Sequence, residues 1–417
     1  MLYGHTLRGA SLIAALLASV LLASACTRTT PSPVVGTAVA RALKKHTPVA
    51  PQIVAADNTF GLMLLNALNP GATSNVAISS TSIALALQMV YNGAEGSTRQ
   101  GMSQALQLQG LEALAVDQDN AALQAALINP DPQVRLTMAN SLWIHLRGSP
   151  VLPAFVGVNE VYYGAKIGDL SGAPDDVNAW VARQTDGLIK KILPPGNYRN
   201  VTAVLANAIY FRGTWTSVFN PNLTKAAPFT LTDGAQVSPQ MMNQTGRFSY
   251  LSGSNFQAVE LPYGKTRRLR MLIILPAAGV DLGDFVAHIT NEKLRTWMAA
   301  LEPAEVRVGL PRFTTIYTTS LVYALTSLGM GEAFNRTADF AGLASRRIYI
   351  SDVTHEAVVQ VDEHGTVAAA ATAVRLVPLS LPISMTMNRP FFYAIVDRKT
   401  GALLFIGTLV DPTASSS

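Results

Sequence analysis

An α+β fold made of one large domain is predicted by the order of the helical and strand-like segments. Apolar residues at helical spacing gather early in the chain, and the strand-like apolar runs begin near residue 134. Strand and helix do not alternate regularly, which argues against a doubly wound sheet. Residues 51–412 show no linker-like break, and 49% of the 417 residues are hydrophobic, enough for a large core. We expect this domain to span residues 51–413, followed by a short tail at 414–417.

The earliest helices are indicated by apolar periodicity and by residues that cap or stop a helix. Apolar side chains recur four residues apart from Phe60 to Leu68, and residues 69–71, Asn-Pro-Gly, end the pattern. The Ser-Ser-Thr-Ser run at 79–82 can cap the free amides of the next helix, Ile83–Tyr91. Two further helices are expected over residues 97–109 and 176–193.

The strands are indicated by short apolar runs that turn residues separate. Most of these runs lie in the second half of the chain, where helical periodicity is weak. Strands are expected over residues 136–144, 201–211, 256–261, 270–275, 306–310, 358–361, 391–396 and 403–408.

The charge of the chain is modest and spread along the sequence. Only 14% of the residues are charged, and the net charge is +5. We interpret the short basic clusters as solvated surface rather than as a polyanion site, and no nucleic-acid partner is expected. These clusters are Lys44-Lys45, Lys190-Lys191, Arg267-Arg268 with Arg270, and Arg346-Arg347.

The start of the chain has the pattern of an export signal. Arg8 precedes an apolar run, Ala10–Ala23, that is too short to span a bilayer and has the proportions of a secretory signal. Small residues then lead directly to Cys26, as in a bacterial lipobox. Residues 1–25 would thus be a lipoprotein-type signal peptide, and an acylated Cys26 would hold the exported protein on a membrane of the bacterial envelope or surface. The alternative is ordinary cleavage near Ala25, which would leave a free thiol on a secreted protein.

The segment between Cys26 and the domain has the composition of a flexible tether. Residues 26–50 are rich in Thr, Pro, Ser, Val and Ala and contain few large hydrophobic side chains. Because Cys26 is the only cysteine, no intrachain disulfide can form. Packing alone must therefore hold the fold together.

A run of mostly small residues, Glu363–Thr372, follows the strand-like run at 358–361. Gly365 lacks a Cβ and tolerates strained backbone angles, so it can act as a pivot for the residues that follow. Such a segment can lie exposed as a loop and can also enter a β-sheet without steric conflict. A surface helix is the alternative, because alanine is the best helix former. The β-branched Thr366 and Val367 favour the strand.

Short motifs between residues 79 and 412 resemble those of one protein family. Asn207 lies eight residues before Trp215, and His355 lies eight residues before Glu363. Residues 79–82 resemble a Ser-Pro-x-Ser motif in which Ser80 replaces the proline. Further matches occur in the same order: Leu310–Phe313, Leu328–Met330 with Phe334, Asn388–Phe391, and Phe405–Gly407 with Pro412. Together they resemble the serpins, a family of serine protease inhibitors.

The resemblance implies the serpin fold, in which early helices pack around a large central mixed β-sheet and an exposed reactive loop can insert into that sheet. It also implies a breach at Trp215, where the sheet opens. The shutter, a polar cluster that controls the separation of the strands, would consist of Ser79, Ser82, Asn207 and His355. The hinge of the loop would consist of Glu363, Gly365, Thr366, Ala368, Ala369, Ala370, Ala371 and Thr372.

The family spacing also implies which bond a protease would attack. In serpins of the antitrypsin type the hinge glycine lies 23 residues before the asparagine of an Asn-x-Pro-Phe motif, and Gly365 and Asn388 are also 23 apart. The reactive bond would then join Leu379 to Ser380. A leucine there suits chymotrypsin-like and elastase-like proteases; Arg375, in a shifted register, is a weaker alternative for trypsin-like enzymes. The residues beside the bond are Val377, Pro378 and Leu381.

The implied activity is suicide inhibition. The partner would be a serine protease, held covalently as an acyl-enzyme through Leu379 while the loop from Thr366 onward enters the central sheet. We expect a monomer with no cofactor and no metal site. The sequence contains none of the motifs that would suggest an enzyme instead: Gly-x-Ser-x-Gly, Ser-x-x-Lys, His-Glu-x-x-His or a phosphate-binding glycine loop.

The stronger alternative is a non-inhibitory serpin that acts as a binding or carrier protein. Such members typically place charged, bulky or proline residues in the hinge. Residues 368–371 are all alanine here, which favours inhibition. His364 and Val367 depart from the commoner charged residues, but neither would block entry of the loop.

Overall fold

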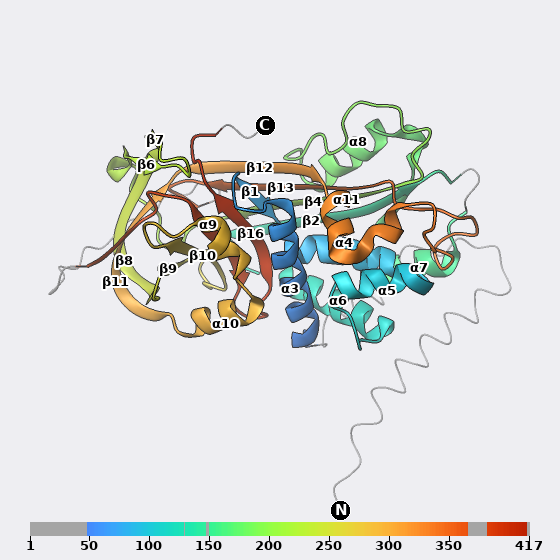
Figure 1. Ribbon diagram of the computed structural model, residues 1–417, viewed down its shortest axis with the longest axis horizontal. Coiled ribbons are helices and arrows are strands. Elements are labelled where there is room, and N and C mark those ends of the chain that lie inside the picture. Colours follow the sequence, from blue (N-terminus) through green and yellow to red (C-terminus); the bar gives the residue numbers. More distant parts are fainter. Residues whose placement is uncertain (1–47, 129, 147–149, 366–381, 415–417) are drawn as a thin grey trace, which may run out of the picture.

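Two β-sheets and the helices packed against them make up the domain in this computed structural model (Figure 1). The structure describes residues 48–128, 130–146, 150–365 and 382–414. Several predicted features lie outside these residues: the signal peptide, Cys26, nearly all of the tether, the hinge from Thr366 to Thr372 and the reactive bond with its neighbours Val377, Pro378 and Leu381.

The early helices pack on one another and on the sheets. Helix α4 (Ser80–Tyr91) is buried along its whole length, and the Ser79 hydroxyl accepts a hydrogen bond from the Ser82 amide at 3.2 Å, which caps its first turn. Because α4 packs against strands of both sheets and against the first helix, it forms the centre of the core. The other helices are α3 (Pro51–Leu68), α5 (Gly96–Ala105), α6 (Ala113–Leu127), α7 (Pro153–Tyr162), α8 (Asp175–Gln184), α9 (Leu282–Ala287), α10 (Asn291–Ala299) and α11 (Val322–Leu325).

A five-stranded mixed sheet carries Asn207 and His355 of the predicted shutter, and one end of it lies beside Trp215 and Gly365. Its order is β12 (Phe313–Ser320), β13 (Asp352–Val361), β4 (Ala203–Gly213), β2 (Val134–Ile144) and β3 (Lys166–Asp169). The two central strands, β13 and β4, run parallel. Helix α4 lies on one face of the sheet, and α8 covers the other face above β2 (Figure 1).

A nine-stranded sheet forms the other half of the domain. Most of its strands are buried on both faces, as expected for the continuous apolar runs in their sequences. Its order is β1 (Val76–Ile78), β16 (Leu403–Leu409), β15 (Phe391–Asp397), β10 (Leu269–Pro276), β9 (Phe256–Pro262), β8 (Gln240–Ser252), β11 (Glu302–Pro311) and β14 (Ile383–Thr386), with β5 (Lys225–Ala226) beside β8. A separate hairpin joins β6 (Phe229–Thr230) to β7 (Gln236–Val237).

The predicted α+β class is confirmed, but one predicted helix is too long. The amphipathic pattern over residues 176–193 gives only α8, which ends at Gln184. The Thr185 hydroxyl bonds to the Val181 carbonyl and accepts from the Ile189 amide, so it closes the last turn. Asp186 and Gly187 then adopt left-handed backbone angles, with φ of +52° and +76°.

Strand β13 is longer than predicted. The expected strand covered residues 358–361, whereas β13 begins at Asp352. Its first half contains Thr354, His355 and Glu356, three polar side chains that are buried despite breaking the apolar pattern. These buried polar residues interrupt the apolar pattern, so the sequence did not indicate the first half of the strand.

Candidate functional site

The candidate site lies between the parallel strands β4 and β13. Their register runs from Val204–Asp352 to Tyr210–Val358. Both strands continue for three more residues, to Gly213 and Val361, where each pairs with its outer neighbour. At this end of the sheet, residues 211–213 and 359–361 therefore face each other but lie outside the paired part of the two strands.

A tight turn closes this end of the sheet. Asp362 and Gly365 exchange two backbone hydrogen bonds, of 2.9 and 3.2 Å, so the chain folds back directly after β13. Gly365 has φ of +124°, and a Cβ on it would lie 2.2 Å from the Gly213 carbonyl oxygen. Only glycine fits this position, which is the predicted pivot of the hinge.

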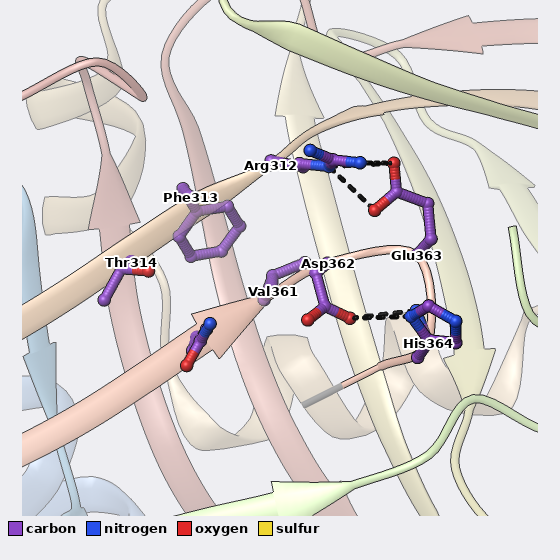
Figure 2. Close-up of a pocket in the computed structure, with 8 residues that line it drawn as sticks. Arg312, Phe313, Thr314, Val361, Asp362, Glu363 and His364 are labelled. Atoms are coloured by element: carbon purple, nitrogen blue, oxygen red, sulfur yellow. Dashed lines mark hydrogen bonds and ion pairs between the residues drawn. The ribbon is translucent and has the colours of Figure 1, made fainter. Parts of the chain in front are cut away.

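An ion pair fixes the same turn from the side (Figure 2). The Arg312 guanidinium, between β11 and β12, donates from Nε to both Glu363 carboxylate oxygens at 2.8 and 2.7 Å. The Thr224 hydroxyl also donates to this carboxylate, and the Phe219 amide donates to the Glu363 carbonyl at 2.8 Å. Burial alone would raise the pKa of Glu363, but the bonds from Arg312 and Thr224 outweigh it and lower that pKa.

The predicted breach residue, Trp215, holds the turn through two hydrogen bonds. Its indole Nε1 donates to the Asp362 carbonyl at 2.9 Å, and its amide donates to the His364 carbonyl at 2.8 Å. The indole stacks on Tyr263, with ring centres 4.2 Å apart. Thus the indole and the backbone amide of Trp215 both hold the turn that follows β13.

Three of the four predicted shutter residues meet in one buried cluster. His355 Nδ1 bonds to Asn207 Oδ1 at 2.6 Å. Asn207 Nδ2 donates to the Ser82 hydroxyl at 2.7 Å and to the Ser82 carbonyl at 3.0 Å. All three residues are 0% exposed. Since His355 and Asn207 belong to β13 and β4, their bond joins the two central strands across the sheet.

The fourth predicted shutter residue, Ser79, lies beside this cluster and caps α4. Ser80, where the family motif has proline, donates its hydroxyl proton to the Leu403 carbonyl, which proline could not do. A Cβ on Gly61 would lie 2.0 Å from the Ser80 Cβ, so α3 and α4 approach closely at this point. Ser80 therefore lies at a tight contact between the two helices.

His355 is neutral in this cluster. Burial lowers its pKa to about 3, because a charged imidazole would lose its hydration there. Asn207 Oδ1 accepts from Nδ1, which therefore carries the proton. The bond between the two strands thus persists across the physiological pH range.

Sequence reasoning missed two polar contacts of the site. Asn140 on β2 lies opposite Asn207 in the register, and its Oδ1 accepts a proton from Asn207 Nδ2 at 2.5 Å. An asparagine within the apolar run of β2 was the available signal. Arg312 is part of the matched motif Leu310–Phe313, but nothing in the sequence pairs it with Glu363.

The family of the chain follows from its similarity to known proteins. A family model described as "Serpin (serine protease inhibitor)" matches residues 55–412. The chain belongs to the serpin family. Members of this family are generally protease inhibitors and not enzymes.

Curated relatives match 87% of this serpin. The leukocyte elastase inhibitor of Bos taurus is 34% identical over 380 residues, which are 87% of this chain and 100% of the relative. Serpin-Z7 of Hordeum vulgare is 34% identical over 391 residues, 87% of this chain and 97% of the relative.

Solved structures share the fold. The thermophilic serpin tengpin in its native state has a TM-score of 0.81 at 28% identity, covering 88% of this chain and 96% of tengpin. Human thyroxine-binding globulin has a TM-score of 0.79 at 26% identity, covering 88% of this chain and all of that one. Proteins similar to this serpin therefore include an elastase inhibitor and a thyroxine-binding protein.

Within the residues that the structure describes, no group of three or more His, Cys, Asp or Glu side chains is placed to hold a metal ion. No helix within the same residues has the length and apolarity needed to cross a bilayer.

Proposed function

We propose that this serpin is a suicide-substrate inhibitor of serine proteases with chymotrypsin-like or elastase-like specificity, and that Leu379–Ser380 is its reactive bond. The proposal rests on the geometry at the end of the β4–β13 pair. There the facing strand edges lie beyond the shared register, directly beside the glycine from which the loop departs. A segment that leaves at Gly365 can enter the sheet between these strands.

The proposed reaction begins as ordinary proteolysis. The serine of the protease attacks the Leu379 carbonyl, the bond to Ser380 breaks, and an ester joins Leu379 to the protease. The segment from Thr366 onward then enters between β4 and β13 and carries the attached protease with it. This segment has 14 residues, about 46 Å of strand.

The energy of insertion is large enough to distort a protease. Each new ladder bond contributes about 0.5–1.5 kcal/mol net, so a strand of this length gains on the order of 10 kcal/mol before the cost of ordering the loop. The whole stability of a typical domain is about 5–15 kcal/mol. Ordering of the inserted strand therefore competes with the native packing of the protease.

The alternative is a serpin that binds a ligand without trapping a protease, and the structural likeness to thyroxine-binding globulin favours it. The two functions differ in the fate of the acyl-enzyme. An inhibitor holds it as a complex that survives denaturation, whereas a carrier is cleaved without forming one, or is not cleaved.

The test is incubation of the domain from residue 50 with a chymotrypsin-like or an elastase-like protease, read on a denaturing gel with mass spectrometry of the released peptide. We expect a band at the summed mass and a C-terminal peptide that begins at Ser380. Cleavage at Ser380 without a complex, with every protease tried, would favour the alternative. A peptide that begins elsewhere would overturn the assignment of Leu379.

We further propose that acylated Cys26 anchors the serpin to the bacterial envelope, on the lipobox-like residues that precede it. The test is expression of the full chain in bacteria fed a labelled fatty acid, with a Cys26→Ser variant as control. We expect label and membrane association for the full chain and neither for the variant. An unlabelled, secreted full chain would show ordinary signal cleavage instead.

A further inference from the structure

Five cationic side chains gather where β9 and β15 end and β10 begins, and we call them the basic face: Arg267, Arg268, Arg270, Arg398 and Lys399. Backbone contacts show that they are neighbours. The Arg398 amide donates to the Arg268 carbonyl at 3.0 Å, and Arg270 Nε donates to the Arg267 carbonyl at 3.1 Å. Two clusters that lie about 130 residues apart in the sequence therefore form one surface.

Buried carboxylates hold three of these arginines in place. Asp397 accepts two bonds of 2.7 Å from Arg268, and Glu260 accepts from Arg270 at 2.8 Å and from Arg398 at 3.1 Å. Both carboxylates are 0% exposed, so their charges point inward while the cations reach the surface. Arg267 and Lys399 are exposed and have no ion pair among the described residues. The face is thus preorganised and carries an excess of three positive charges.

Neighbouring charges leave this excess in place. Lys265 lies beside Asp131, whose carboxylate accepts from the Thr266 amide, and these two charges offset each other. On α10, Glu292 and Arg295 line the same hollow as Arg398 and also offset each other.

The excess does not reflect a generally basic domain. Residues 1–47 contain Arg8, Arg28, Arg41, Lys44 and Lys45 and no acidic residue. The rest of the chain therefore holds 26 of the 31 Lys and Arg residues against all 26 Asp and Glu residues. A face with an excess of three positive charges on a neutral domain is a local concentration of charge, and the domain follows a basic tether.

The basic face lies at the end of the domain where the tether joins. Asn58 on α3 donates to the Gly401 carbonyl at 2.9 Å, two residues beyond Lys399, and bonds to Asn291 at the start of α10. Helix α3 begins at Pro51, seven residues before Asn58, or about 10 Å along the helix. Figure 1 shows the start of α3 and α10 at the same edge of the domain.

We propose that the basic face docks onto the anionic phospholipid headgroups of the membrane to which Cys26 is attached. This inference rests on the proposed anchor. An acyl anchor brings the end of the domain near the membrane, and each lysine or arginine near an anionic surface adds about 1 kcal/mol of attraction. The lipid and the basic face would together fix the orientation of the serpin as well as its location.

The test uses the unlipidated domain from Pro48, which lacks the tether charges. Its buried core runs from Ile53 to Val410, and the bovine relative consists wholly of the matched part, so this portion folds alone. Sedimentation with phosphatidylcholine vesicles, with and without phosphatidylglycerol, measures binding at low salt. We expect binding only to the anionic vesicles and at least a tenfold loss in the double variant Arg267→Glu/Lys399→Glu. The matched control is Arg346→Glu/Arg347→Glu, which reverses two exposed cations elsewhere.

Each other outcome overturns the inference. An equal loss in the control variant would show only a general effect of net charge. An absence of binding to anionic vesicles, or binding that the Arg267/Lys399 variant retains, would remove the docking face. Binding to heparin without binding to vesicles would point to a soluble polyanion. Since the assay contains no protease and no acylated cysteine, its failure would leave the proposed inhibition and anchoring intact.

Discussion

Replacing Ala370 by proline is expected to turn this serpin from an inhibitor into a substrate. Proline has no amide proton and has a fixed φ, so it removes a ladder bond and hinders the entry of the loop between β4 and β13. The acyl-enzyme then hydrolyses before the protease is trapped. We expect the yield of complex on a denaturing gel to fall at least tenfold, while cleavage at Leu379 continues at its normal rate.

The hinge offers a matched pair of charged variants. A strand alternates its faces, so Thr366 and Val367 point to opposite sides of an inserted loop. Thr366→Arg places a charge toward the body of the protein and is expected to abolish trapping. Val367→Arg places the same charge on the face that already carries Arg375, and it is expected to retain trapping. If Ala370→Pro and Thr366→Arg both trap protease as well as the unaltered serpin does, the hinge assignment is wrong.

The apolar strands were predictable because the hydrophobicity of their own side chains is enough to indicate burial in a sheet. The runs that became β10, β15 and β16 are buried on both faces, and uninterrupted apolar residues identify them in the sequence. Helix α6 was not predicted, because two of its buried residues are polar. Asp117 and Asn120 both bond to the Tyr163 hydroxyl, so the apolar stripe of the helix is interrupted. Only the folded chain shows that these polar groups have partners.

The polar contacts of the site were predictable only where the family resemblance covered them. It brought together Ser82, Asn207 and His355 across as many as 273 residues, which no local pattern could do. Asn140 joins the same cluster through the register of β2 and β4, and a register depends on the pairing of whole strands. The Arg312–Glu363 pair likewise depends on how β11 passes into β12 beside the end of β13.

Replacing Asn207 by alanine is expected to lower the free energy of unfolding by about 3 kcal/mol. Its side chain bonds to His355, Ser82 and Asn140 in an interior that water does not reach. Alanine would leave the His355 Nδ1 proton, the Ser82 hydroxyl and the Asn140 oxygen each without this partner, and a buried group without a partner costs about 1–3 kcal/mol. We also expect the active form to be lost faster on storage, because Asn207 and His355 join the two strands that separate in the proposed mechanism.

The measurement is the midpoint of the first denaturation transition in urea, with residual inhibition followed on the same samples. Asn140→Ala is the matched control, because it removes a buried asparagine of the same cluster that makes one of these bonds and leaves Asn207 with Ser82 and His355. We expect that control to cost about 1 kcal/mol. Equal midpoints for the two variants would show that Asn207 contributes no more than its neighbour. The bond between β4 and β13 would then not control the opening of the sheet, and the Trp215 contacts and the Arg312–Glu363 pair at the end of β13 would be the restraints left to test.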